Sequence, residues 1–230
     1  MEQNQMVERG AAGAGLLTIL LGIIIVLIMP VSANVSEGFR TPIIAFEFAA
    51  TADDLAFLSD ADPDGPANRD KMDRGHRWDM LFPVAYGIFL ALLLVQAAQA
   101  GFRPGWWFVP FALLAIPFDI WENTLLVSIT GSLSNGGTGE EFLGALRTAT
   151  WLKWGAIALG AAGLGWESWE KREYWSAGLA IMTGLVTAIA WMLGSEPFWV
   201  ELMAMLVFIF YFWFVVKQCL RVARRKKEIA

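Results

Sequence analysis

The chain has 230 residues, of which 57% are hydrophobic and only 17% are charged. Soluble domains are usually less apolar and carry about 25% charged residues, so this composition excludes an ordinary soluble globular protein. The formal net charge of −5 combines an acidic stretch at 53–73 with a basic tail at 217–230. A short cationic tail beside an apolar segment is typical of a membrane topology signal, which excludes nucleic acid as the expected partner.

Six stretches are long and apolar enough to cross a membrane as helices, each of which needs about 20 residues. The predicted fold is therefore all-α, a polytopic bundle of six transmembrane helices in one membrane domain covering 1–230. The first span is interpreted as an uncleaved anchor, because one Arg and two Glu precede it. In chain order the predicted spans are 11–30, 78–100, 106–129, 143–166, 174–193 and 198–216.

The basic tail predicts the orientation of the bundle, because Lys and Arg are concentrated in cytoplasmic segments. It places the C-terminus in the cytoplasm, and an even number of spans places the N-terminus there too. The long connection 31–77 then faces outward. We expect a multi-pass protein of the bacterial cytoplasmic membrane, in contact with lipid and open to self-association or to other membrane subunits.

The outer connection has predicted structure of its own. Thr41-Pro42 precedes an apolar run to Phe48, which predicts a short amphipathic helix lying on the membrane, with proline at its first position. Thr51 and Asp54 have the spacing of a capping pattern for another short helix. Residues 59–76 are polar and rich in Asp, Gly and Pro, and we expect a loop there.

Single copies of two residue types limit the cofactors. Cys219 is the one cysteine and His76 the one histidine, so an intrachain disulfide and a thiolate metal site are excluded. His76 lies in the expected polar loop and not in an apolar span. We therefore expect no haem ligated by this chain.

The third span contains the most informative motif, Asp119, Glu122 and Asn123. Spacings of three and four residues place these side chains on one helical face, and Trp121 points away. A charge at the bilayer centre costs at least about 2.5 kcal/mol, so this face must turn toward the bundle interior, a partner or a wet cavity.

Other polar residues fall in the same, outer half of the predicted bundle. They are Asp79 and Tyr86 of the second span, Arg147 and Lys153 of the fourth, and Glu47 of the amphipathic segment. We predict one intramembrane ligand-binding site that opens outward, with Lys153 as the counter-ion of Asp119 or Glu122. The alternative is that these ion pairs only lock helices together. As a site, the carboxylates would exchange a proton, bind a cation, or hold a lipid or isoprenoid head group.

A second motif is the sequence Asp60-Ala61-Asp62-Pro63-Asp64-Gly65, followed by Asn68. Oxygen ligands at alternate positions before a glycine are typical of the start of a calcium loop. Asp60, Asp62, Asp64 and Asn68 are therefore candidate Ca²⁺ ligands. Lys71 stands at the twelfth position, where such loops have a bidentate Glu, and an acidic solvated loop is the alternative.

Several of these short motifs occur together in residues 40–155. Phe46-Glu47-Phe48-Ala49, then Trp78-Asp79 with Phe82 and Tyr86, then Asp119-x-x-Glu122-Asn123 resemble an uncharacterised family of bacterial multi-span membrane proteins. The resemblance implies no activity.

Two functions remain open from the sequence. In the first, the outward-opening polar site binds a small ligand, an ion or a lipid head group, as part of a transporter or a membrane enzyme. In the second, the protein is a non-catalytic accessory or assembly subunit of a larger membrane complex, such as a respiratory or photosynthetic one. Whether the chain is an enzyme, and which residues would be catalytic, does not follow from the motifs.

Overall fold

The computed structural model describes residues 2–229, with side-chain environments for 4–225. This part of the chain is all-α. Its elements are, in chain order, α1 (Glu2–Ile28), α2 (Pro42–Glu47), the 3-10 helix η1 (Ala52–Leu58), α3 (Gly65–Asp79), α4 (Phe82–Gln99), α5 (Gly105–Ser134), α6 (Glu140–Glu170), α7 (Tyr174–Met192) and α8 (Pro197–Ile229).

Five helical segments are long and apolar enough to cross a membrane, so this is a multi-span helical membrane protein. They are Asn4–Ile28, Gly65–Gln99, Gly105–Ser134, Tyr174–Met192 and Pro197–Arg225. α6 is equally long, with 31 residues, but it does not belong to this set. Lys153 and the many Gly and Trp residues of α6 lower its hydropathy.

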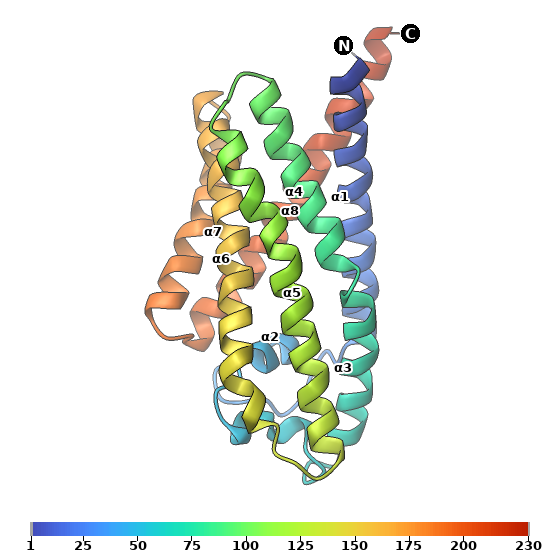
Figure 1. Ribbon diagram of the computed structural model, residues 1–230, viewed down its shortest axis with the longest axis vertical. Helices are drawn as coiled ribbons and strands as arrows, with labels where there is room; N and C mark the ends of the chain where they lie inside the picture. Colours follow the sequence, from blue (N-terminus) through green and yellow to red (C-terminus); the bar gives the residue numbers. More distant parts are fainter. Residues whose placement is uncertain (1, 230) are drawn as a thin grey trace.

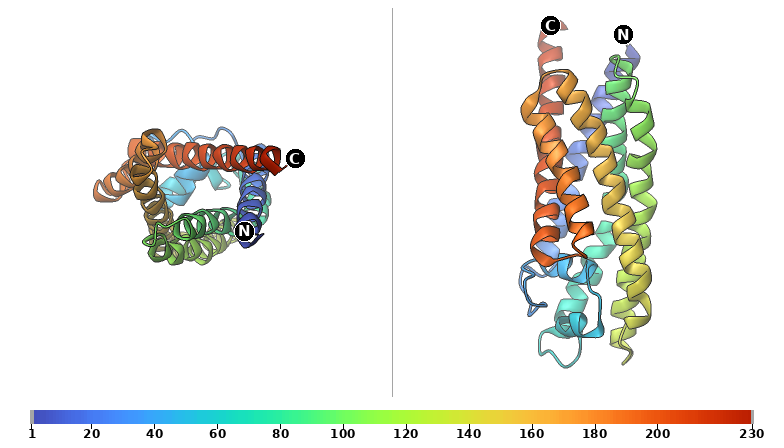
Figure 2. Two further views of the ribbon diagram at one scale, coloured as in Figure 1. Left: turned by 90° about the horizontal axis from the view of Figure 1, so that it is seen from above. Right: turned by 90° about the vertical axis from the view of Figure 1, so that its left-hand side faces the viewer.

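The long helices form a closed ring around a packed interior. Contacts link α1 to α4, α4 to α5, α5 to α6, α6 to α7, α7 to α8, and α8 back to α1. Both termini lie at one end of the bundle, and α2, η1 and most of α3 lie at the other (Figure 1). Seen from above, α8 runs obliquely from the corner beside α1 to the side of α7 (Figure 2).

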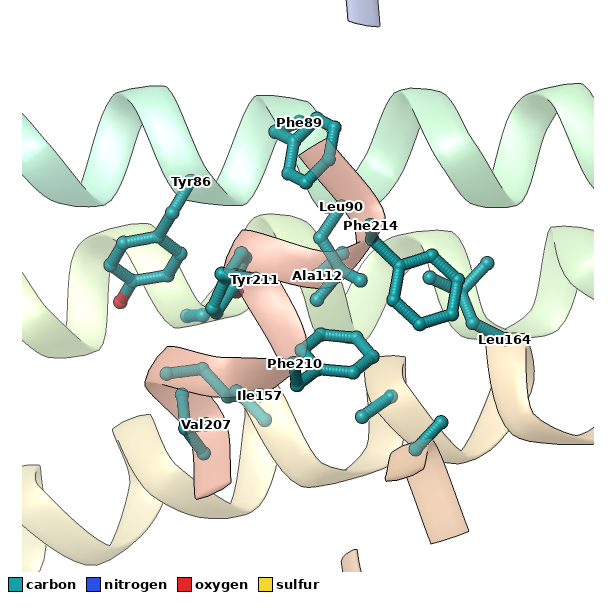
Figure 3. Packing of buried hydrophobic residues seen from close by; sticks show 14 of the residues in the cluster. Tyr86, Phe89, Leu90, Ala112, Ile157, Leu164, Val207, Phe210, Tyr211 and Phe214 are labelled. Atoms are coloured by element: carbon teal, nitrogen blue, oxygen red, sulfur yellow. The ribbon is translucent and has the colours of Figure 1, made fainter. Parts of the chain in front are cut away.

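The interior of the ring is filled by aromatic and branched side chains (Figure 3). The rings of Phe210 and Phe214 are 4.8 Å apart, and those of Tyr86 and Tyr211 are 5.5 Å apart. Gly160 brings α6 close to α4, because a Cβ atom there would lie 2.6 Å from a methyl carbon of Leu90. This packing separates the two ends of the bundle.

The prediction of a loop at 59–76 is wrong, because α3 covers most of it. The buried residues Gly65, Asn68, Arg69, Met72, Gly75 and His76 recur at helical spacing, so one face of this polar helix packs against the protein. Proline in its first turn favours the start at Gly65. His76 is correspondingly fully buried, with its ring 6.0 Å from that of Phe46.

The predicted helix after Thr41 is present as α2, but it does not lie on the membrane surface. Pro42, Ile44, Ala45, Phe46 and Glu47 are all buried, and α2 contacts α5, α6 and α8. Glu201 of α8 holds the start of this segment, since its carboxylate accepts the backbone N–H of Arg40 at 2.9 Å and of Thr41 at 2.8 Å. The hydroxyl of Thr41 donates to the same carboxylate at 2.7 Å.

The capping pattern at Thr51 is confirmed, and it begins η1. The Asp54 carboxylate accepts hydrogen bonds from the hydroxyl of Ser36 at 2.6 Å and from the backbone N–H of Thr51 at 2.9 Å and of Ala50 at 3.0 Å. Partial burial raises the pKa of Asp54, but these donors outweigh burial and hold the pKa below its ordinary value. The connection between α1 and α4 is thus an ordered cap at one end of the bundle.

Candidate functional site

The predicted polar face of α5 is confirmed. Asp119, Glu122 and Asn123 are buried, whereas Trp121 is 40% exposed. α5 contains two prolines, Pro110 and Pro117, but it remains one helix. Its buried face still runs from Ala112 to Asn123. The face turns toward the bundle interior, where it meets side chains from α2, α3, α4 and α6.

A buried ion-paired trio forms the closed part of the site. The ammonium group of Lys153 contacts the carboxylate of Glu122 and lies 3.0 Å from the carboxylate of Glu47. The three side chains are 5%, 0% and 9% exposed, respectively. Trp154 supports the trio, because its ring lies 4.8 Å below the ammonium group and its indole N–H donates to Glu47 at 3.3 Å.

Asp119 forms a second group beside this trio. One carboxylate oxygen accepts the hydroxyl of Tyr86 at 2.7 Å, and the other accepts the amide N–H of Asn123 at 3.2 Å. The same amide donates to the backbone carbonyl of Asp79 at 3.3 Å. The Asp79 carboxylate forms no ion pair with the residues that the structure describes, and the amide of Asn123 is the side-chain donor beside it.

These groups stand at one side of a cavity of about 390 Å³. Its charged and hydroxyl lining consists of Glu47, Asp79, Asp119, Lys153, Tyr86, Tyr211, Thr18, Thr41 and, at the exposed rim, Arg40. The remaining lining comes mainly from apolar side chains of α1, α2 and α8. The cavity therefore has a polar floor and apolar walls.

The structure brings most of the predicted site residues together, with different exposure to the cavity. Glu47, Asp79, Tyr86, Asp119 and Lys153 line it, whereas Glu122 and Asn123 lie behind this lining. The expectation for Arg147 does not fit, because its side chain is exposed and does not line the cavity. Arg147 lies further toward the end of α6, beyond the buried Thr150.

Tyr211 is a site residue that the sequence reasoning missed. It lines the cavity, is 5% exposed, and its hydroxyl is buried without a hydrogen-bond partner among the described residues. Figure 3 shows it beside Tyr86. A tyrosine inside an otherwise apolar span was the available signal, because a buried tyrosine hydroxyl usually has a partner.

The candidate calcium ligands are not gathered into a site. The carboxylate of Asp60 contacts the guanidinium of Arg69, and the side chain of Asn68 donates to the carbonyl of Phe57 at 3.1 Å. The chain enters α3 at Gly65, so Asn68 lies on the helix and not in one loop with the three aspartates. Within the described residues there is no group of three or more His, Cys, Asp or Glu that could hold a metal ion, so the geometry does not support this prediction.

A further set of polar contacts joins the helices near the two termini. Lys217 of α8 pairs with Glu173, and Arg225 of α8 pairs with Glu8 of α1 at 2.8 Å. The side chain of Gln218 donates to the carbonyl of Glu8 at 2.9 Å. Part of the basic tail is thus used to attach α8 to its neighbours.

No protein-family model matches the chain, and no match was found among curated proteins or among solved structures. The resemblance to uncharacterised bacterial membrane proteins therefore remains without an identified family. What the site does has to be argued from its geometry.

Proposed function

We propose that this protein crosses the membrane six times and binds a small ligand, an ion or a lipid head group in the cavity. In this arrangement α6, fourth in chain order, adds to the five apolar segments and completes the ring, and both termini are cytoplasmic, as the basic tail favours. The cavity then lies in the outer half of the bundle. A volume of about 390 Å³ is in the range of small-molecule sites.

The observation that carries this proposal is the exposure of Asp79 and Asp119 to the cavity. Ionisable residues at membrane depth are costly and usually mark a functional site. In the trio of Glu47, Glu122 and Lys153, both carboxylates share one ammonium group, and Glu122 lies behind the cavity lining. Asp79 has no cationic partner in the described structure, so the carboxylates that face the cavity are the part available to a ligand.

Native mass spectrometry of the protein extracted gently from its own membranes tests the proposal. We expect a discrete bound mass that is lost in Asp119→Asn and retained in Asp53→Asn, which makes the same chemical change at an exposed position. A circular dichroism melt of each variant separates lost binding from lost folding. Folded wild-type protein that carries no bound mass would contradict the proposal.

One observation favours the second function, an accessory subunit. Lys153 is buried and paired with two carboxylates, which is also the arrangement of a structural lock, and large apolar side chains such as Trp107 and Trp191 are exposed on the outside of the ring. Co-purification of defined partner subunits in place of a small mass would support this function.

A further inference from the structure

The cavity lies at the junction of α1 and α8, and the two helices meet at only one end of it. Near the termini they are tied by Gln218 and Glu8, and Gly15 is so close to Val215 that a Cβ atom would lie 2.9 Å from its methyl group. From there the helices diverge toward the end that holds α2 (Figures 1 and 2).

The opposite limit of this junction is set by Glu201 and its hydrogen bonds to Arg40 and Thr41. Between the two limits, α1 and α8 both line the cavity. The opening between the two helices is therefore bounded by the contact of Gly15 with Val215 at one end and by the carboxylate of Glu201 at the other.

The walls of this opening are apolar on both helices. α1 contributes Ile19, Ile25 and Val26, and α8 contributes Ala204 and Phe208. Val26 is 60% exposed and Phe208 is 57% exposed, although both line the cavity. In a membrane-spanning bundle, such side chains face acyl chains, so the opening leads sideways into the lipid and not only toward water.

The floor of the cavity offers more hydrogen-bond acceptors than free donors. Lys153 is engaged by Glu47 and Glu122. Each oxygen of Asp119 accepts one hydrogen bond, and each can accept another. Asp79 has no ion pair with the described residues and has the Asn123 amide as its neighbouring donor, and the hydroxyl of Tyr211 lacks a partner among them.

A protonated amine complements this excess of acceptors and carboxylates. It supplies three N–H donors and a positive charge, whereas a carboxylate or phosphate would face Asp79 and Asp119 directly. The cationic residue Arg40 cannot offset that repulsion, because it lies at the exposed rim. The apolar walls complete the match by accommodating a hydrocarbon chain that extends into the bilayer.

Resting on the proposed binding function, we propose that the ligand class is a single-chain amphiphile with a cationic amine head group, which enters from the lipid between α1 and α8. Its head group binds Asp79 and Asp119, and its chain leaves between the apolar walls of the two helices.

Photolabelling of the protein in phosphatidylcholine nanodiscs tests this inference. The probe is hexadecylamine with a diazirine on its chain, and the competitors are hexadecylamine, hexadecanol, hexadecanoate and methylamine. We expect saturable labelling of α1 and α8, with hexadecylamine competing at least about tenfold better than the others, the equivalent of about 1.4 kcal/mol for one charged contact. Asp79→Asn should weaken labelling by a similar factor.

A matched pair of variants tests the route of entry. Ala204→Trp places a large side chain at the opening and should slow labelling, whereas Met205→Trp, on the adjacent lipid-facing position outside the cavity lining, should leave the rate unchanged. Neither variant touches the ion-paired trio. Equal rates in the two variants would overturn entry between α1 and α8.

The remaining outcomes separate this inference from the proposed function. If methylamine competes as well as hexadecylamine, the cavity is a binding site, but the ligand is not an amphiphile. If hexadecanoate competes best, the amine head group is wrong. If labelling is not saturable and the folded protein carries no bound mass, both the inference and the proposed function fail.

Discussion

Replacement of Lys153 by methionine tests whether the buried trio is held together by charge. Methionine nearly retains the length of the lysine side chain but removes the cation that lies between Glu122 and Glu47. Both carboxylates are at least nine-tenths buried, so neither gains solvation to replace the lost partner. Removal of one member of a buried ion pair costs about 3–5 kcal/mol, and we expect a loss of that size for Lys153→Met.

A compensated variant separates charge from packing. In the triple variant Glu47→Gln, Glu122→Gln and Lys153→Met, the uncompensated charges are gone and the indole of Trp154 keeps an acceptor at position 47. We expect it to recover at least about 2 kcal/mol of the loss, because a buried ion pair as a whole contributes little net stability. Equilibrium unfolding in mixed micelles, followed by circular dichroism, measures both differences.

Arg74→Met is the control. Arg74 of α3 also pairs with a carboxylate, that of Asp70 at 3.0 Å, but the two side chains are 57% and 67% exposed, so removal of the charge should cost at most about 1 kcal/mol. A loss in Lys153→Met no larger than in this control would refute the charge argument. A triple variant as unstable as the single one would assign the loss to packing.

Three further predictions concern other parts of the structure. Tyr86→Phe removes the donor to Asp119 and should cost about 1.5–3 kcal/mol of unfolding free energy, measured in the same micelles. Gly65→Ala places a Cβ 1.8 Å from a backbone carbonyl oxygen, so it should unfold the start of α3 and lower the melting temperature, whereas Gly178→Ala, with nothing within 4 Å, should not. Asp54→Ala should cost about 1 kcal/mol at neutral pH, and its difference from wild type should vanish as the pH falls below 3.8 through the lowered pKa of Asp54.

Local patterns predicted the long helices and the buried face of α5 well. Apolar length identifies a spanning helix directly, and the spacing of Asp119, Glu122 and Asn123 fixes their common face whatever the neighbours are. The capping pattern at Thr51 was equally local. Each of these features depends only on residues within one or two turns.

Features that depend on distant partners were missed or misplaced. Glu47 reaches Lys153 from more than 100 positions away, and the sequence around α2 could not distinguish a helix on the membrane surface from one inserted into the bundle. α3 was hidden by its polar composition, although Met72 and His76 stand at helical spacing. Lys153 was predicted to pair with either Asp119 or Glu122, and in the structure it pairs with Glu122. The spacing within α5 could not decide between them, because it does not say which carboxylate a neighbouring helix meets.

The ring of helices has a mechanical consequence at the junction of α1 and α8. Every other neighbouring pair in the ring is joined by a short turn or, for α1 and α4, by the folded cap formed by α2, η1 and α3. α1 and α8 are far apart in the sequence, so no short turn joins them in the part of the chain that the structure describes. Side-chain contacts and the hydrogen bonds of Glu201 and Gln218 hold this junction, so it has fewer covalent restraints on widening than the other junctions of the ring.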